Sequence, residues 1–128
     1  MDVRELIPQH KSDFQRTEKL KNIEKDKIRP IIPELLVWLQ DGNWPVATEV
    51  RDILLPLDKE LLPHIRSILK TNDSEWKLFL LTCLVSGLPK DTISELKHDL
   101  FDITHNPSVS DKASEVDEAA RNTLDMID

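Results

Sequence analysis

An approximate repeat of about 32 residues restricts the fold of this 128-residue chain more than any other feature of its sequence. The segment 31–39 aligns with the segment 61–69 at an offset of 30 residues, and Pro33 then falls on Pro63. Apolar residues within both segments recur at the spacing of an α-helix. One helix–turn–helix unit cannot bury its own apolar stripe, whereas stacked units can. The repeat therefore predicts a stack of helix pairs.

Helix boundaries follow from the same spacing and from residues that start or stop helices. The expected helices span residues 12–22, 30–40, 45–56, 58–70, 74–88, 91–105 and 111–127. Ser12 with Gln15, and Thr92 with Glu95, have the form of capping boxes, in which a hydroxyl accepts an unpaired N–H of the first turn. Gly42 follows a predicted helix end and is expected to adopt the left-handed conformation of a C-cap.

The predicted helix 74–88 differs from the others because it carries no charge after Lys77. A helix that is apolar all round is normally enclosed, so we expect this one at the centre of the stack. The inward faces of the other helices supply the rest of the core. The predicted core comprises Leu35, Trp38, Leu39, Val46, Val50, Ile53, Leu54, Leu61, Ile65, Ile68, Leu69, Trp76, Phe79, Leu80, Cys83, Leu84, Leu96, Leu100, Ile103, Val116, Ala120, Thr123, Leu124 and Ile127.

The repeat unit resembles a HEAT-type helical repeat. Pro33 and Pro63 match the opening of that unit, and Asp41 and Asp73 match its inter-helix turn. The resemblance implies an all-α, right-handed superhelix of the HEAT or armadillo kind, built as a single domain over residues 1–128. Its expected parts are an N-terminal capping helix at 12–22 and repeats at 30–56, 58–89 and 91–127.

A narrower resemblance concerns the segment from Pro30 to Ala47, which reads PIIPELLVWLQDGNWPVA. This segment is similar to small bacterial proteins grouped only as a domain of unknown function, and the likeness extends over nearly the whole chain. The resemblance implies the helical fold and no catalytic residue, because none is assigned to that group.

Composition excludes several classes of protein. The two glycines, Gly42 and Gly87, lie 45 residues apart, so no glycine-rich phosphate loop can form. A single cysteine, Cys83, excludes an internal disulfide and a cysteine-based metal site, and it fits a reducing compartment. Neither a signal peptide nor an apolar run of the ~20 residues that cross a bilayer is visible. We therefore expect a cytoplasmic protein without membrane contact.

Four side chains form the strongest candidate for chemistry. Glu95, His98, Asp102 and His105 share one face of the predicted helix 91–105. Histidine and carboxylate ligands of this kind bind zinc or a di-metal centre. The alternative, which we prefer, is a solvated polar face, because a di-metal bundle needs Glu-x-x-His twice and the chain has it once. No metal or other cofactor is therefore expected, and Cys83, among apolar neighbours, is expected as an unreactive core thiol.

Binding of nucleic acid is not expected from the charge distribution. Residues 11–29 hold seven basic and four acidic side chains, whereas residues 107–128 hold two basic and six acidic ones. A formal net charge of −7 opposes wrapping of a phosphate backbone. The same charge favours a basic partner.

The turn around Trp44 is the candidate binding surface. Trp44 precedes Pro45, which holds the backbone extended, and two roles are open for it. It packs as a staple over the next helix, or it stays half exposed as an anchor for a partner, since tryptophan is enriched in interface hot spots. The candidate binding residues of this region are Trp44, Asp41, Asn43 and Glu49.

These observations favour a non-catalytic module that binds another macromolecule, most simply a protein, because stacked helices present long ridged faces. An immunity-type protein that neutralises a basic toxin is one specific version. The alternatives are a small metal-dependent or nucleic-acid-processing enzyme, and a structural part of a larger assembly. A fold alone does not decide among them.

Overall fold

The computed structural model describes residues 2–127, and every regular element in that range is a helix, which confirms the all-α prediction. The α-helices are α1 (Phe14–Leu20), α2 (Lys25–Ile28), α3 (Ile32–Leu36), α4 (Pro45–Leu54), α5 (Leu62–Leu69), α6 (Ser74–Phe79), α7 (Lys90–Ser94), α8 (Lys97–His105), α9 (Val109–Ala113) and α10 (Val116–Asp125). The 3-10 helices are η1 (Val3–Leu6), η2 (Arg29–Ile31), η3 (Val37–Leu39), η4 (Leu55–Leu61) and η6 (Val85–Gly87), and η5 (Leu80–Leu84) is a π-helix.

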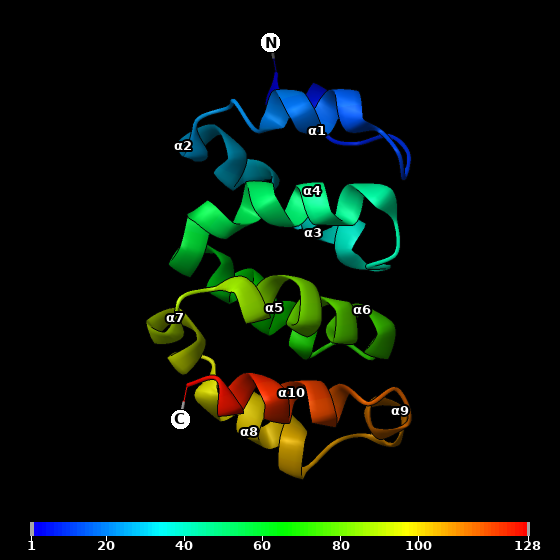
Figure 1. Cartoon of the computed structure of the whole chain (residues 1–128), viewed down its shortest axis with the longest axis vertical. Helices are drawn as coiled ribbons and strands as arrows, with labels where there is room; N and C mark the ends of the chain where they lie inside the picture. The colour runs from blue at the N-terminus through cyan, green and yellow to red at the C-terminus, as the bar shows by residue number, and fades with distance from the viewer. Residues whose placement is uncertain (1, 128) are drawn as a thin grey trace.

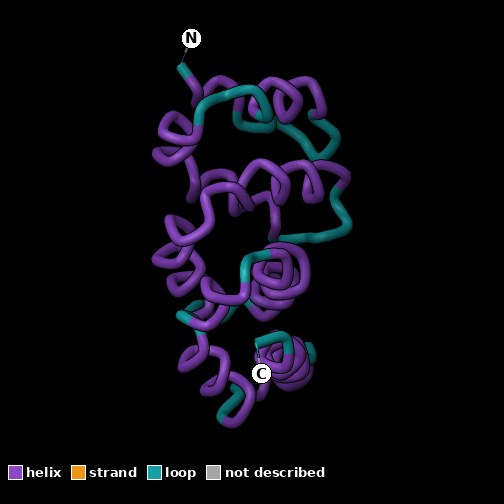
Figure 2. The backbone as a smooth tube through the Cα atoms, turned by 60° about the vertical axis from the view of Figure 1, so that its left-hand side comes forward, coloured by secondary structure: helices purple, strands orange, loops and turns teal. Residues whose placement is uncertain are grey.

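The helices lie in layers along the long axis of the molecule (Figure 1). α1 and α2 form the first layer, α3 and α4 the second, α5 and α6 the third, and α8 and α10 the last. The short helix α7 lies at one edge between the third layer and the last, and α9 lies at the opposite edge, beside α10 in the last layer. Figure 2 shows the same succession from another side, with loops confined to the connections between helices.

Six of the polar contacts between neighbouring layers join residues that are 30 to 34 positions apart along the chain. They are Arg4–Glu34, Arg29–Glu60, Lys59–Asp91, Arg66–Asp99, Asp58–Thr92 and Lys77–Asp111. The separation agrees with the interval of the sequence repeat. Each such contact therefore connects one unit to its neighbour.

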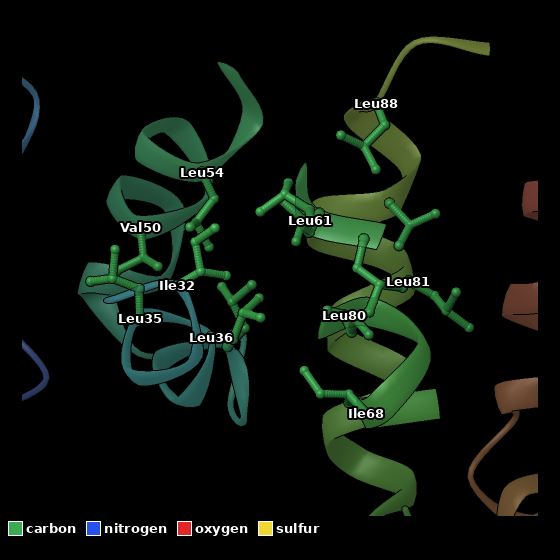
Figure 3. Packing of buried hydrophobic residues seen from close by; sticks show 14 of the residues in the cluster. Ile32, Leu35, Leu36, Val50, Leu54, Leu61, Ile68, Leu80, Leu81 and Leu88 are labelled. Carbon is green, nitrogen blue, oxygen red and sulfur yellow. The ribbon is translucent and has the colours of Figure 1, made fainter. Parts of the chain in front are cut away.

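Buried leucine, isoleucine and valine side chains fill the space between the layers. Figure 3 shows residues of α3 and α4, such as Leu36 and Leu54, and residues of the next pair, such as Leu61 and Leu80, within this shared core. All four are at most 1% exposed. Burial of one such side chain stabilises a fold by about 1.5–3 kcal/mol.

Six residues of the predicted core are only partly buried, so the prediction of full burial was wrong for them. Half-buried positions are occupied by Trp38, Trp76, Phe79, Cys83, Leu124 and Ile127. The core also extends to buried residues outside the prediction, namely Leu6, Leu20, Ile28, Ile31, Ile32, Leu36, Ala47, Leu57, Leu62, Leu81, Val85, Leu88, Ile93 and Ala119.

The predicted central helix 74–88 is one continuous rod, but it changes from α to π to 3-10 geometry along its length. It is not enclosed on all sides as predicted, because Leu78 and Cys83 are half-buried and Thr82 is exposed. Its single late charge, Lys77, is instead buried. Some apolar side chains of this helix are therefore left partly exposed.

The expected start signals were wrong in detail. Asp13, not Ser12, caps α1, and its carboxylate accepts the backbone N–H of Arg16. Thr92 lies inside α7, where its hydroxyl donates to Asp58 instead of capping a helix. Gly42 has no left-handed backbone. A Cβ at Gly42 would meet the Phe79 ring, so the glycine permits close approach rather than a positive φ.

Two predicted long helices are each broken in two. The segment 91–105 bends at Leu96, where α7 ends and α8 begins. The segment 111–127 breaks at Glu115, whose φ of 64° is left-handed. Both breaks let consecutive short helices bury apolar residues in different directions, which one straight helix cannot do.

No helix within the described residues is long and apolar enough to cross a membrane.

Candidate binding groove

An open groove of about 360 Å³ separates α3 from α5 on one side of the stack. We call it the α3–α5 groove and define it by its lining residues, which are Pro33, Leu36, His64, Ser67, Ile68, Thr71 and Trp76. The volume falls within the range of ligand sites, about 300–1,000 Å³. Two consecutive repeat units supply its walls, so the groove is a product of their stacking.

Trp76 closes one end of the groove. Its indole Nε1–H donates to the carbonyl of Leu36 at 3.1 Å, which ties the start of α6 to the end of α3. An indole whose only donor is satisfied presents an apolar surface to whatever lies beside it. Trp76 is half-buried, so part of this surface remains open to the groove.

The exposed wall of the groove belongs to α5. His64 and Ser67 lie at i and i+3 on one face of α5, and Thr71 follows the end of that helix. The Ser67 hydroxyl donates to the carbonyl of Pro63 within the same helix. The basic residues of α5 point elsewhere, because Arg66 pairs with Asp99 and Lys70 lines a second hollow beside α8. No lysine or arginine lines the α3–α5 groove, and His64 is the one titratable side chain in its lining.

Three carboxylates that do not line the groove lie near Trp76 or after η3 in the sequence, and we call them the acidic rim: Asp41, Asp73 and Glu75. Asp73 caps α6 by accepting the backbone N–H of Trp76 at 3.0 Å. Asp41 follows η3 and accepts the N–H of Asn43 at 2.8 Å. Within residues 2–127, none of the three forms an ion pair.

At the other end of the groove, Glu34 pairs with Arg4 at 3.0 Å. Burial raises the pKa of Glu34, but the hydrogen bond and charge of Arg4, a hydrogen bond from its own backbone N–H and the nearby charge of His64 together lower it more, so the net pKa lies below its usual range. The negative charge of Glu34 is therefore balanced by Arg4, whereas the carboxylates of the acidic rim form no ion pair within residues 2–127.

The candidate binding residues around Trp44 lie in different places. Trp44 packs edge-on against Trp38, with ring centroids 5.5 Å apart, and is half-buried. Glu49 pairs with Lys21, the residue that follows α1, and this pair joins the first two layers. Asn43 is exposed, and only Asp41 of this set belongs to the acidic rim. The turn thus does not bring the four residues together as one surface.

A family model described as "Domain of unknown function (DUF5071)" matches residues 6–124. The chain belongs to the DUF5071 family. Comparison with curated proteins gave no match.

In this DUF5071 chain the predicted metal ligands are divided between elements. Glu95 follows the end of α7 and pairs with Lys59, whereas His98, Asp102 and His105 lie on α8. The prediction that all four share one helix was wrong, because the helix breaks at Leu96. His105 stacks on Phe101 with ring centroids 4.1 Å apart, and Asp102 accepts from Asn106. No group of three possible ligands among residues 2–127 is arranged to hold a metal ion.

The DUF5071 chain also contains a buried polar cluster that sequence reasoning missed. Ser74 donates to one oxygen of Asp111 at 2.6 Å, and Lys77 donates to the other at 2.8 Å. Ser110 lies 2.8 Å from the Ser74 hydroxyl. Serine, lysine and aspartate occur together in hydrolytic sites, but here each of these three residues is at most 6% exposed. The cluster joins α6 to α9.

Sequence reasoning did not find the α3–α5 groove either. The outward positions His64 and Ser67 of the predicted helix 58–70 were a usable signal, because a helix has one face left after its apolar stripe is assigned. The opposite wall of the groove consists of Pro33 and Leu36, which belong to another unit. The sequence of one segment does not determine its distance from another, so the groove between them could not be predicted.

Proposed function

We propose that this chain is a non-catalytic binding module: a HEAT-like stack of helix pairs, wound as a right-handed superhelix, whose α3–α5 groove receives a segment of another protein. The module acts in the cytoplasm and carries out no reaction of its own.

The observation that carries the proposal is the groove itself. It is open to solvent, it is lined largely by apolar side chains, and it crosses two units of the stack. Exposed apolar surface on a small protein commonly marks a site of interaction. A half-buried tryptophan at its end is the residue type most enriched where interfaces concentrate their binding energy.

The disposition of charged groups also supports a binding role. Arg4, Arg29, Lys59, Arg66 and Lys77 each pair with a carboxylate of another layer. Their hydrogen-bonding capacity is used in holding the stack together. The groove, in contrast, offers shape and apolar surface, which suit recognition of a partner.

The experiment is affinity capture from the organism that encodes the chain, followed by titration of each purified candidate. We expect one protein to bind the purified chain at one-to-one stoichiometry, measured by calorimetry. Ser67→Arg places a long side chain in the groove and should weaken this binding by at least about tenfold, or 1.4 kcal/mol.

Ser94→Arg is the matched control. Ser94 is exposed on α7, and its hydroxyl donates to the carbonyl four residues earlier, just as that of Ser67 does. Both variants add one positive charge. Equal loss of binding in the two, or full binding by Ser67→Arg, would contradict a role for the groove, and absence of any stoichiometric partner would contradict the binding function.

A further inference from the structure

We propose that α9 is a latch: it undocks from α6 as a unit while the rest of the stack stays folded, and its docking fixes the first turn of α6, at the Trp76 end of the α3–α5 groove. The undocking is a property of the free chain. Its consequence for binding in the groove rests on the proposed function.

One buried carboxylate accounts for most of the attachment of α9. Among residues 109–113, all of which the structure describes, Asp111 alone is buried, at 5% exposed. Val109 is 90% exposed, and the other three residues of the helix are exposed as well. Apolar burial, which normally dominates the stability of a packed helix, is thus nearly absent here. The docking of α9 therefore depends on what Asp111 binds.

The Asp111 carboxylate binds two donors of α6 at once. One oxygen accepts from the Ser74 hydroxyl at 2.6 Å, and the other accepts from the Lys77 ammonium at 2.8 Å. A buried ion pair is favourable only when its geometry and its further hydrogen bonds are complete, because each charge is costly to bury alone. Partial separation would leave both charges without a partner and without water. The cluster therefore favours a docked and an undocked state over intermediate positions.

Both ends of α9 are suited to absorb such a movement. α8 ends at His105, and Asn106 and Pro107 follow it outside any helix. At the other end Glu115 has a φ of 64°, in the left-handed region, which is strained for a residue other than glycine. Hinges are a few residues at the ends of elements that take up the change in backbone angles. Undocking would release the strain at Glu115, while α8 and α10 remain packed against each other.

The first turn of α6 is held from two sides. On one side, the Ser74 hydroxyl and the Lys77 ammonium reach Asp111 of α9. On the other side, the Trp76 indole N–H donates to the Leu36 carbonyl at 3.1 Å. Loss of either anchor frees this turn to move against the other. We therefore infer that docking of α9 and placement of the Trp76 indole are coupled, and such a coupling acts equally in both directions.

The first test is amide hydrogen exchange of the wild-type chain, followed by NMR at low concentrations of urea. We expect the hydrogen-bonded amides of Lys112 and Ser114 to be protected, but to exchange through an opening that exposes little surface. Their exchange should depend on urea much less steeply than that of α8 and α10, because the slope measures the surface exposed. Absence of protection in α9, or the same urea dependence as in α10, would overturn the latch.

Asp111→Asn tests the carboxylate, because the amide keeps the size of the side chain but leaves Lys77 without a counter-charge. We expect the α9 amides to exchange at least about a hundredfold faster in this variant, while those of α4 are unchanged. Asp99→Asn is the matched control, since it removes another cross-layer pair, with Arg66, on the neighbouring helix α8. Equal acceleration of α9 in both variants, or none in Asp111→Asn, would contradict the role of Asp111.

A second pair of variants tests the coupling. Trp76→Phe removes the indole N–H that binds the Leu36 carbonyl and should speed exchange of the α9 amides by about twofold to tenfold, as expected for loss of one hydrogen bond. Trp44 packs against Trp38 elsewhere in the stack, so Trp44→Phe should leave α9 exchange unchanged. In Asp111→Asn the indole N–H signal of Trp76 should shift, whereas that of Trp44 should stay in place.

The coupling is overturned if the Trp76 signal stays in place in Asp111→Asn and if Trp76→Phe leaves α9 exchange unchanged. Equal effects of Trp76→Phe and Trp44→Phe would overturn it as well. These measurements use no partner. Failure of the latch would therefore leave the proposed binding function untouched, and failure of partner capture would leave the evidence for the latch untouched.

Discussion

Lys77 and Asp111 form an ion pair of 2.8 Å between α6 and α9, with side chains only 5% and 7% exposed. Removing one partner of a buried pair leaves a buried charge uncompensated, which costs about 3–5 kcal/mol. We expect Lys77→Met to lower the free energy of unfolding by this amount, measured by urea denaturation. Arg51→Met removes an exposed pair with Asp52 and should cost less than about 1 kcal/mol.

Replacing both charges together should be far less harmful. In Lys77→Met with Asp111→Leu no buried charge remains, and Ser74 keeps Ser110 as a hydrogen-bond partner. We expect the double variant to recover most of the stability lost in Lys77→Met. A double variant no more stable than the single one would show that the pair itself, rather than the uncompensated charge, stabilises this junction.

Gly42 tests the close approach between the second and third layers. A Cβ there would lie 3.0 Å from Phe79 Cε1 and 3.1 Å from Cys83 Sγ. We expect Gly42→Ala to destabilise the protein by about 1–3 kcal/mol through overpacking, measured by thermal unfolding. Gly87→Ala meets only the flexible Leu55 side chain, at 3.3 Å, and should be neutral or stabilising by up to about 1 kcal/mol. Equal effects at the two glycines would contradict the packing argument.

Asp58 has a φ of 50° and a ψ of −116°, a backbone region that favours glycine. Its carboxylate accepts a hydrogen bond from the buried Thr92 hydroxyl. Asp58→Gly and Asp58→Ala both lose that bond, but only alanine keeps the backbone strain. We expect the alanine variant to be less stable than the glycine variant by about 1 kcal/mol or more in urea denaturation. Identical stabilities of the alanine and glycine variants would show that the backbone at residue 58 relaxes to an unstrained conformation.

Asp13 should make the fold sensitive to acid. Burial raises the pKa of its carboxyl, but hydrogen bonds from Gln9 and Arg16 and the charge of Arg16 lower it more, so it lies below the usual 3.8. A lowered pKa contributes stability that is complete above the unfolded value and is lost as pH falls through the folded one. We expect the free energy of unfolding to fall less steeply below about pH 4 in Asp13→Asn than in the wild type. The same flattening in Asp26→Asn would attribute the effect to net charge.

The all-helical architecture and the positions of most core residues were predictable, because apolar spacing along a helix is a local property. Leu35, Ile65 and Leu100 belong to such stripes, and all three are fully buried. The breaks at Leu96 and Glu115 were not predictable. The residues around them have ordinary helix propensity, and the direction each short helix takes depends on contacts with other layers.

The candidate sites were harder to predict from the sequence, because they also depend on contacts between distant segments. Lys77 reads as the last charge of an otherwise apolar helix, and its burial depends on Asp111, 34 residues later. Glu95 was assigned to the same helix as His98, but α7 ends at Ser94 and α8 begins at Lys97. The α3–α5 groove needs two walls from two units. Features made by one segment were predicted, whereas features made between segments were not.

The layered arrangement has a mechanical consequence. α1 and α10 lie in the first and last layers, and the cross-layer ion pairs connect only neighbouring units (Figure 1). A force that pulls these two ends apart would act on every junction between layers. The weakest junction would therefore separate first, and the remaining layers would keep their own contacts. Stretched as a single molecule, the chain should lengthen in successive steps rather than in one rupture.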